Sequence, residues 1–259
     1  MRLGIFSKIF PRASLGETLD AVRSLGISSV QFNGPGEGIR EEFERRQIKI
    51  EVLSATFNII HPDPKARRVG FERFATLASS AKELDASILS VCTGTYDLED
   101  MWRKHPKNES SEAWREMVTA MAKLATIAEE HDVTIAFEPE QANVIDSASK
   151  ARALLDALQS RRVKVLMDAA NLLTISNLAQ QEWVLKEAFE LVGYDIAAAH
   201  AKEFSADGTL GQAAIGRGVV DFPLYVSLLG DAGFQNSLIM HGFLESEARE
   251  STAYLSQLM

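Results

Sequence analysis

The sequence reads Ala198-Ala199-His200-Ala201-Lys202-Glu203 at the point where an apolar run that begins at Ile196 comes to an end. Such a run is typical of a buried strand, and a histidine is an unusual residue to find at its end. Three other apolar runs end in similar groups, namely Glu138, Asp168 and His241. Because all strands of an α/β barrel end on one face, where the active site lies, these four strand ends are predicted to converge.

The rest of the chain predicts the same architecture. Apolar runs predict strands over residues 3–6, 28–32, 48–57, 87–93, 133–137, 163–167, 196–199 and 237–240. Helical spacing of apolar residues predicts helices over residues 15–25, 39–46, 69–84, 111–130, 147–158, 182–192, 222–229 and 246–258. Eight alternating pairs favour a closed α/β fold, a (β/α)8 TIM barrel, over an open sheet. A glycine-rich turn at 33–38 and irregular loops at 58–64 and 94–108 connect these elements.

Composition and charge limit the possible function classes. The 259 residues are 46% hydrophobic and show no compositional break, so one barrel domain over residues 1–259 is expected. The net charge of −9 argues against a nucleic-acid partner. The one cysteine, Cys92, excludes an internal disulfide and a cysteine-based zinc site. No apolar run approaches the ~20 residues of a membrane span, and residues 1–6 show no signal-peptide pattern, so we expect a cytoplasmic protein without a membrane partner.

The two-residue period of a strand indicates which side chains face the barrel interior. Glu138 shares a face with Thr134 and Ala136, whereas Ile135 and Phe137 lie on the other face. The strand that ends in Asp168 shows the same division. The more apolar face suits packing against the helices, which leaves the smaller or more polar face for the interior.

Two carboxylates and two imidazoles suit a divalent ion such as Mn²⁺, Mg²⁺, Co²⁺, Fe²⁺ or Zn²⁺. One such ion, held by Glu138, Asp168, His200 and His241, would polarise the carbonyl of a sugar or hydroxy-ketone. A carboxylate beside the ion could then remove the α-proton, and Lys202 could hold the developing oxyanion. Each group alone has an ordinary explanation as a helix cap or a hydrogen-bonded core residue, so the prediction depends on all four together.

Other residues are weaker candidates for substrate binding. His61 lies next to a proline in a loop on the expected active face, where a structural role is equally compatible with the sequence. Arg217 lies in the turn Gly216-Arg217-Gly218, which either cradles a phosphate or sugar oxygen or is a plain turn. Glu140 shares a face with Glu138 and is a reserve base, and Glu203 ends the stretch quoted above.

At these residues the sequence resembles the xylose isomerase-like barrel superfamily, in particular its sugar phosphate isomerase/epimerase branch. The matching segments are Phe137-Glu138-Pro139, Asp168-Ala169-Ala170-Asn171, His200-Ala201-Lys202-Glu203 and Gly216-Arg217-Gly218-Val219-Val220-Asp221-Phe222. Their order and spacing match from residue 134 to the C-terminus, and residues 61–68 and 81–94 resemble the family's first half less specifically. The resemblance implies a small carbohydrate substrate, one divalent metal ion and, as in many barrels of this family, a homodimer.

The ketose epimerases of this family hold their metal with Glu, Asp, His and Glu, and the two glutamates act on opposite faces of the substrate. Glu138, Asp168 and His200 match these positions, but His241 stands where the family has the second Glu. Asn171 stands where many members have His, and Glu203 where Asp is usual. A neutral imidazole makes the site one unit more positive and removes the second carboxylate base.

The resemblance therefore implies a metal-dependent isomerase or epimerase that transfers a proton through an enediolate. Its predicted catalytic residues are Glu138, His241 and Lys202. The His241 departure removes one base of a two-base epimerisation, but a one-base shuttle by Glu138 survives. Two alternatives stay open. One is a metal-dependent dehydratase or lyase, in which His241 protonates the leaving hydroxyl, and the other is a non-catalytic sugar-binding barrel.

Overall fold

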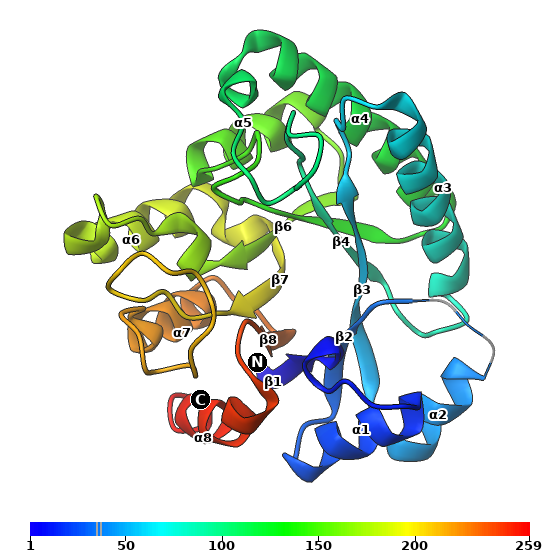
Figure 1. Cartoon of the computed structure of the whole chain (residues 1–259), viewed down its shortest axis with the longest axis vertical. Helices are drawn as coiled ribbons and strands as arrows, with labels where there is room; N and C mark the ends of the chain where they lie inside the picture. The colour runs from blue at the N-terminus through cyan, green and yellow to red at the C-terminus, as the bar shows by residue number, and fades with distance from the viewer. Residues whose placement is uncertain (35, 37) are drawn as a thin grey trace.

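The computed structural model describes residues 1–34, 36 and 38–259 (Figure 1). Over this part of the chain, eight parallel strands alternate with eight α-helices. The strands are β1 (Arg2–Phe6), β2 (Ser29–Phe32), β3 (Lys49–Asn58), β4 (Ile88–Cys92), β5 (Thr134–Glu138), β6 (Val163–Asp168), β7 (Ile196–Ala201) and β8 (Ser237–Met240). The helices are α1 (Leu15–Ser24), α2 (Ile39–Arg46), α3 (Pro64–Ala81), α4 (Ser111–Glu130), α5 (Ala148–Leu158), α6 (Gln181–Val192), α7 (Phe222–Asp231) and α8 (Ala248–Ser256). The strands pair in chain order and β8 pairs with β1, which confirms the predicted closed barrel.

The predicted elements differ from the observed ones mainly at their ends. The third helix begins at Pro64 rather than at residue 69, because the Asp63 carboxylate accepts a hydrogen bond from the Lys65 amide and proline suits the first helical position. The last helix begins at Ala248 rather than at residue 246, because a 3-10 turn over Glu245–Glu247 precedes it. The glycine-rich turn predicted at 33–38 includes Pro35 and Glu37, which lie outside the described residues.

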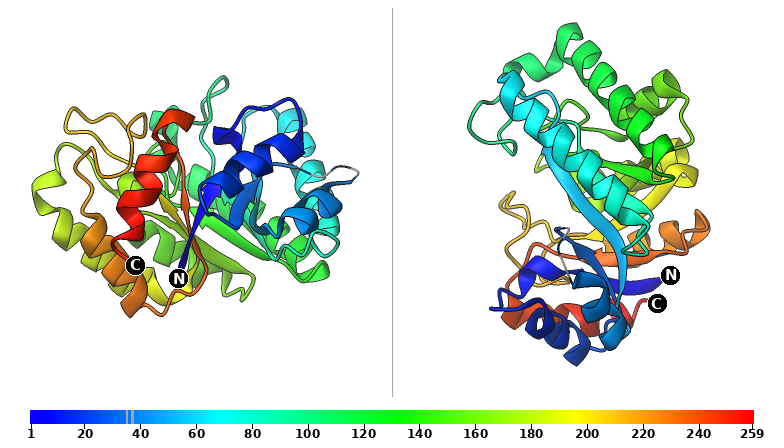
Figure 2. Two further views of the ribbon diagram at one scale, coloured as in Figure 1. Left: turned by 90° about the horizontal axis from the view of Figure 1, so that it is seen from below. Right: turned by 90° about the vertical axis from the view of Figure 1, so that its right-hand side faces the viewer.

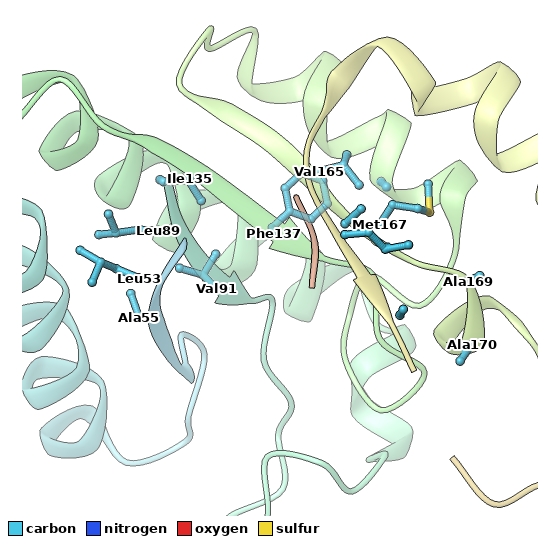
Figure 3. Close-up of a cluster of buried hydrophobic side chains, with 14 of the residues drawn as sticks. Leu53, Ala55, Leu89, Val91, Ile135, Phe137, Val165, Met167, Ala169 and Ala170 are labelled. Atoms are coloured by element: carbon cyan, nitrogen blue, oxygen red, sulfur yellow. The ribbon is translucent and has the colours of Figure 1, made fainter. Parts of the chain in front are cut away.

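The outward faces of the strands carry the main hydrophobic core. Figure 3 shows side chains of β3 to β6 that belong to one large buried cluster shared with the surrounding helices. These include Leu53, Ala55, Leu89, Val91, Ile135, Phe137, Val165 and Met167. The prediction that the more apolar face of each strand packs against helices is therefore confirmed for β5 and β6.

A second, smaller cluster fills the middle of the barrel. It consists of Val52, Ile88, Ala136, Leu166 and Ala198. Gly4 also approaches this interior, where a methyl group on its Cα would lie 2.4 Å from the Cδ1 atom of Ile239. These apolar side chains separate the two ends of the barrel interior. The polar groups at the C-terminal ends of the strands therefore face a space that is closed on the N-terminal side.

The N-terminal end of the barrel is closed by buried polar groups. The Glu51 carboxylate accepts hydrogen bonds from the hydroxyls of Ser29 and Ser237, both at 3.0 Å, and forms an ion pair with Arg2 at 3.5 Å. Both chain termini lie at this end beside β1 and α8, as the two views of Figure 2 show. Within the described residues, no helix has the length and apolar character needed to cross a membrane.

Candidate active site

Four potential metal ligands meet at the C-terminal end of the barrel. Glu138 ends β5, Asp168 ends β6, His200 lies near the end of β7 and His241 follows β8. Each offers one ligand atom, and these four atoms lie within 4.8 Å of one another. The register of β6 and β7 explains why two of these residues are close, since Asp168 pairs directly with His200. The four strand ends chosen from the sequence are thus brought together by closure of the barrel.

Three of the four groups, Glu138, His200 and His241, line a cavity of about 560 Å³, and Asp168 lies behind them in contact with His241 and Lys202. This volume lies within the range of about 300–1,000 Å³ that small-molecule sites occupy. The rim includes Trp102, whose side chain is half exposed, and Met101 from the loop after β4. Phe6, after which β1 ends, lines the same cavity beside His241, with their ring centroids 6.4 Å apart.

A buried chain of polar contacts links the two carboxylates. The Asn171 amide group donates to Oε1 of Glu138 at 2.8 Å, and its oxygen accepts from the Lys202 ammonium at 2.6 Å. The same ammonium lies 3.3 Å from Oδ2 of Asp168. The other oxygen of Asp168, Oδ1, accepts from the Ala170 amide at 3.0 Å and thereby caps the following turn. The carboxylate oxygens that Asn171 and Lys202 contact, Oε1 of Glu138 and Oδ2 of Asp168, are also the ones that face the imidazoles.

Gln31 on β2 orients His200. Oε1 of Gln31 lies 2.7 Å from Nε2 of His200, while the Gln31 amide group donates to the Ser90 hydroxyl at 3.4 Å. Because the Gln31 oxygen can only accept, this network assigns a proton to Nε2, and Nδ1 is the ring nitrogen that faces Glu138. Nδ1 lies 3.3 Å from Oε1 of Glu138. Two lone-pair groups so placed repel each other unless a proton or a metal ion lies between them.

His241 faces Asp168 in a similar way. Its Nε2 atom lies 3.3 Å from Oδ2 of Asp168, and its ring centroid lies 4.3 Å from that of His200. Burial, together with the nearby charge of His200, lowers the pKa of His241 to about 4, although the hydrogen bond with Asp168 opposes this. His241 is therefore a neutral imidazole at neutral pH, which is the form that binds metals.

The charges of the site follow from its burial and its pairs. Burial alone would raise the pKa of Asp168, but Lys202 and His241 outweigh it and hold the pKa below its usual range. For Glu138, burial is likewise outweighed by His200 and Lys202, so its pKa is lowered too. Burial would lower the pKa of Lys202, but Asp168, Glu138 and Glu140 raise it. The site thus holds two carboxylates and one ammonium.

Glu140 differs from its neighbours because no cation contacts its carboxylate within the described part of the chain. Burial raises the pKa of Glu140 to about 7, and only the more distant charge of Lys202 opposes this shift strongly. Glu140 lines the cavity. A carboxyl group that exchanges its proton near neutral pH is suited to general acid or base catalysis.

The donor set fits a divalent metal ion. Two carboxylate oxygens and two neutral imidazole nitrogens match the ligand preferences of Zn²⁺, Mn²⁺, Co²⁺ and Fe²⁺. Nδ1 of His200 and Oε1 of Glu138, 3.3 Å apart, could both bind such a cation, and Gln31 supplies the outer hydrogen bond that metal-bound histidines usually make. Lys202 already contributes one positive charge beside Asp168, so metal and ammonium would share that carboxylate.

Three predicted substrate residues lie away from the cavity wall. His61 accepts from the Asp63 amide through Nδ1 at 3.0 Å, so its Nε2 holds the proton and donates to the Leu98 carbonyl at 3.2 Å. Glu203 is fully buried, and its carboxylate accepts hydrogen bonds only from backbone amides among the described residues. Arg217 is exposed and pairs with Glu250. A substrate-binding role for these residues stays a prediction, and their contacts favour structural roles.

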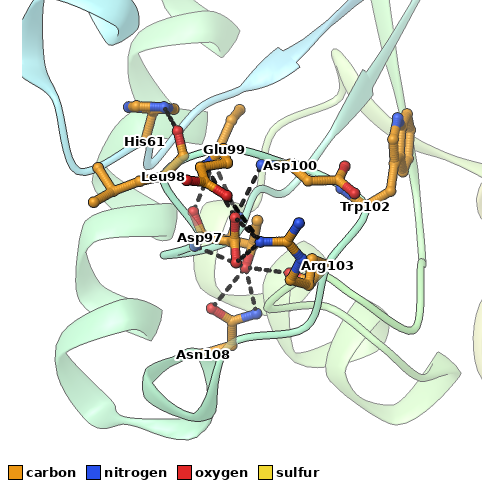
Figure 4. A network of polar contacts seen from close by, with 10 residues as sticks. His61, Asp97, Leu98, Glu99, Asp100, Trp102, Arg103 and Asn108 are labelled. Atoms are coloured by element: carbon orange, nitrogen blue, oxygen red, sulfur yellow. Dashed lines mark hydrogen bonds and ion pairs between the residues drawn. The ribbon is translucent and has the colours of Figure 1, made fainter.

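The loop after β4, which His61 contacts through the Leu98 carbonyl, is held by a network of polar contacts (Figure 4) and carries Trp102 of the cavity lining. Asn108 fixes its base by donating to the Thr95 hydroxyl and accepting from the Tyr96 amide, both at 2.9 Å. Further along, the Asp100 carboxylate accepts from the Trp102 amide at 2.9 Å. The loop is therefore ordered by its own polar residues and presents Trp102 to the cavity. The 94–108 segment, which the sequence marked only as long and irregular, has this defined shape.

Several residues of the site were not found from the sequence. Gln31, Lys8 and Arg73 line the cavity from β2, from the turn after β1 and from α3. Gln31 had a weak signal, since it is a polar residue between Val30 and Phe32 and lies near the strand's end. Lys8 and Arg73 had none, because basic residues after a strand and on a helix are ordinary surface features.

The family follows from comparison with known proteins. A family model described as xylose isomerase-like TIM barrel matches residues 19–258. The chain belongs to this family. A comparison with curated protein sequences finds no match.

Solved structures show the same fold over the whole chain. A 3-keto-D-glucoside 4-epimerase, YcjR, from E. coli has a TM-score of 0.79 at 16% identity, with 100% of this chain and 98% of that chain covered. The IOLI protein, solved with a binding zinc atom, has a TM-score of 0.74 at 17% identity, with 100% and 96% covered. A probable 3-DHS dehydratase, AsbF, from Bacillus anthracis has a TM-score of 0.76 at 14% identity, with 99% of both chains covered. Sugar epimerases, a zinc-binding protein and a probable dehydratase thus share this barrel.

Proposed function

We propose that this chain is a divalent-metal-dependent isomerase or epimerase that transfers a proton on a small sugar or sugar-like hydroxy-carbonyl compound. The observation that carries the proposal is the convergence of Glu138, Asp168, His200 and His241, whose ligand atoms lie within 4.8 Å of one another. Three of these residues, Glu138, His200 and His241, line the cavity of about 560 Å³. The family and the epimerases among the structural neighbours support the same reaction class. The proposal names Mn²⁺, Mg²⁺, Co²⁺, Fe²⁺ or Zn²⁺ as the ion.

When bound, the ion would act as a Lewis acid that polarises the substrate carbonyl and so acidifies the neighbouring C–H bond. We propose that Glu138 takes the proton. It is ionised at neutral pH, because His200 and Lys202 lower its pKa, and the Asn171 amide fixes one of its oxygens at 2.8 Å. Loss of the α-proton converts the substrate to an enediolate. Return of this proton from Glu138 to the former carbonyl carbon, together with transfer of the hydroxyl proton to the former carbonyl oxygen, gives the isomer.

Lys202 stabilises the oxyanion that develops during this transfer. Its ammonium is held between Asn171 and Asp168 at 2.6 Å and 3.3 Å, and its pKa is raised, so it stays charged in a buried site. A preorganised cation in a low-dielectric cavity favours a transition state that gains negative charge. Trp102 lines the same cavity, and we propose that its indole ring packs against the apolar side of a sugar ring.

A metal-dependent dehydratase is the second candidate. It needs a group that gives a proton to the leaving hydroxyl. His241 suits this poorly, because burial lowers its pKa to about 4 and keeps it unprotonated. Glu140 suits it better, since its pKa of about 7 leaves much of it protonated at neutral pH and its carboxyl group lines the cavity. The dehydratase therefore depends on Glu140, whereas the isomerase does not require it.

The metal content of the full-length protein is the first test. The protein is incubated with each of the five ions, desalted and measured by elemental analysis, beside His241→Ala and the control His131→Ala, which removes an exposed histidine on another surface. We expect about one ion per chain in the wild type and the control, and clearly less in His241→Ala. No bound ion in any sample would overturn the metal-dependent proposal.

The reaction class is then tested with ketoses and aldoses in D₂O. An isomerase or epimerase incorporates deuterium from solvent at the carbon next to the carbonyl without loss of water, whereas a dehydratase gives a product lighter by one water. Glu138→Gln should abolish exchange while the protein stays folded. Exchange that persists in Glu138→Gln would contradict its assignment as the base.

A further inference from the structure

The structure assigns an anion-binding subsite to the β1–β3 side of the cavity, where we propose that Lys8 and Arg73 bind a carboxylate or phosphate group carried by the substrate. The inference rests on the proposed function, because it names the class of compound on which that function acts. It commits to an acidic sugar derivative rather than a neutral sugar.

Lys8 is positioned beside the candidate metal ligands. It lies in the one-turn 3-10 helix Ser7–Ile9 that follows β1, and its ammonium stands 4.3 Å from the centroid of the Phe6 ring. The Phe6 ring in turn lies 6.4 Å from His241. A cation–π contact holds the ammonium over the ring without neutralising it. Lys8 therefore lines the cavity, and the Phe6 ring lies between its ammonium and His241 of the metal-ligand cluster.

The charge of Lys8 lacks a partner in the part of the chain that the structure describes. No carboxylate oxygen of these residues lies within 4.0 Å of its ammonium. Burial lowers the pKa of Lys8, and the more distant Glu138 offsets this only in part. Lys202 on the other side of the cavity shows the contrast, because it is paired with Asp168 at 3.3 Å. Lys202 has its counterion within the protein, and Lys8 has room for one in the cavity.

Arg73 adds a second cation from the neighbouring wall. Its guanidinium, carried by α3, donates to the carbonyl oxygens of Ser54 at 3.0 Å, Thr56 at 3.2 Å and Asn33 at 3.4 Å. These are neutral acceptors, so they fix the guanidinium at the ends of β2 and β3 and leave its charge in place. Within the described residues Arg73 forms no ion pair, and it lines the same cavity as Lys8. Arginine and lysine together are common ligands of carboxylate and phosphate groups.

The two cations that form no ion pair within the described residues lie across the barrel from the metal-ligand carboxylates. Glu138 and Asp168 end β5 and β6, whereas Lys8 and Arg73 lie at β1 and at β2–β3. In a barrel closed in chain order, β5 lies across from β1. In the metal-free protein the carboxylates of Glu138 and Asp168 outnumber the one ammonium of Lys202, so an anionic group would be attracted to Lys8 and Arg73 rather than to that side. This division would orient an acidic substrate, with its charged end at β1–β3 and its carbonyl at Glu138.

Three ligands that share one carbon chain test the subsite. D-Glucitol is neutral, D-gluconate carries a carboxylate at one end, and D-glucitol 6-phosphate carries a phosphate at one end; none has the carbonyl needed for isomerisation. Their binding is measured by calorimetry on the full-length protein after metal removal, so that an anion cannot bind to a metal ion instead. The variants are Lys8→Met, Lys8→Arg and Arg73→Gln, with Lys123→Met as a control that removes a charge from α4 outside this cavity.

We expect at least one anionic ligand to bind about tenfold more tightly than D-glucitol, and the stronger of the two identifies carboxylate or phosphate. Lys8→Met and Arg73→Gln should each remove most of this preference, Lys8→Arg should restore it, and Lys123→Met should leave it unchanged. Equal binding of all three ligands, no measurable binding of either anion, or a preference unaffected by both variants would overturn the subsite. Because the test uses metal-free protein, its result is separate from the metal content that decides the proposed function.

Discussion

Glu203 provides a direct test of how this barrel is held together. The sequence marks it as a candidate substrate ligand, but its side chain is fully buried. Oε1 accepts from the amides of Phe204 at 3.0 Å and Val220 at 3.1 Å, and Oε2 accepts from the amide of Gly216 at 2.8 Å. The carboxylate thus fastens the loop between β7 and α7 from inside, and a methyl group at Gly218 would lie 2.4 Å from it.

The substitution Glu203→Gln keeps the shape and removes one acceptor. If the amide oxygen keeps the two bonds that Oε1 makes, the NH₂ group faces the Gly216 amide, so one charge-assisted bond is lost and one buried N–H is left without an acceptor. A hydrogen bond to a charged group contributes about 1.5–3 kcal/mol, and an unsatisfied buried group costs about 1–3 kcal/mol. The lost hydrogen bond and the unsatisfied N–H arise from the same contact, so their free energies are not simply added. We expect the free energy of unfolding to fall by about 3 kcal/mol.

Urea denaturation followed by circular dichroism measures this change. Glu245→Gln is the matched control, because Glu245 pairs with Arg12 at the surface and an exposed ion pair contributes at most about 1 kcal/mol. Binding of D-gluconate and D-glucitol 6-phosphate is measured on both variants under conditions where they are folded. If Glu203→Gln were as stable as the control but bound these ligands much more weakly, the structural role would be refuted and the substrate role supported.

Three further predictions concern the cavity. Gln31→Leu removes the acceptor that orients His200, so metal affinity should fall about 10–100-fold in a metal titration; unchanged affinity would contradict the assigned tautomer. Lys202→Met removes the ammonium that would share the Asp168 carboxylate with the metal ion, so the same titration should show tighter metal binding. Turnover should fall about 10²–10³-fold, because the cation that stabilises the oxyanion is lost. Weaker metal binding would contradict the idea that ion and ammonium share this carboxylate. Burial raises the pKa of Glu140 to about 7, so its contribution to stability is present at low pH and is lost as the pH rises through 7. The free energy of unfolding of metal-free Glu140→Gln, measured in urea relative to the wild type, should therefore rise by about 1 kcal/mol between about pH 6 and pH 8. A fall in this difference would contradict the raised pKa of Glu140.

The position of the four candidate ligands could be predicted because each depends on a local pattern. An apolar run that ends in Glu138, Asp168, His200 or His241 identifies a strand and its end, and parallel strands of a barrel all end on one face. The two-residue period then places Glu138 on the interior face with Ala136. The family resemblance rests on the same segments, and the family match confirms it.

The roles of the loop residues could not be predicted in this way. His61 and Arg217 lie where loops approach the active face, but their partners, the Leu98 carbonyl and Glu250, are 37 and 33 residues away in the chain. Which donor meets which acceptor over such separations depends on how the loops pack. For Glu203 the motif was recognised, yet only the path of the loop back to Gly216 shows that its carboxylate binds backbone amides.

By itself, then, the sequence determined the barrel and the four strand ends that meet in it, because periodicity and strand ends are properties of short segments. The tertiary structure alone decided that Gln31 orients His200, that Asn171 joins Glu138 to Lys202, and that Lys8 and Arg73 face the acidic side across one cavity. The physical reason is that closure of β8 onto β1 brings together side chains separated by up to most of the chain, and hydrogen bonds and charges act over distances in space rather than along the sequence.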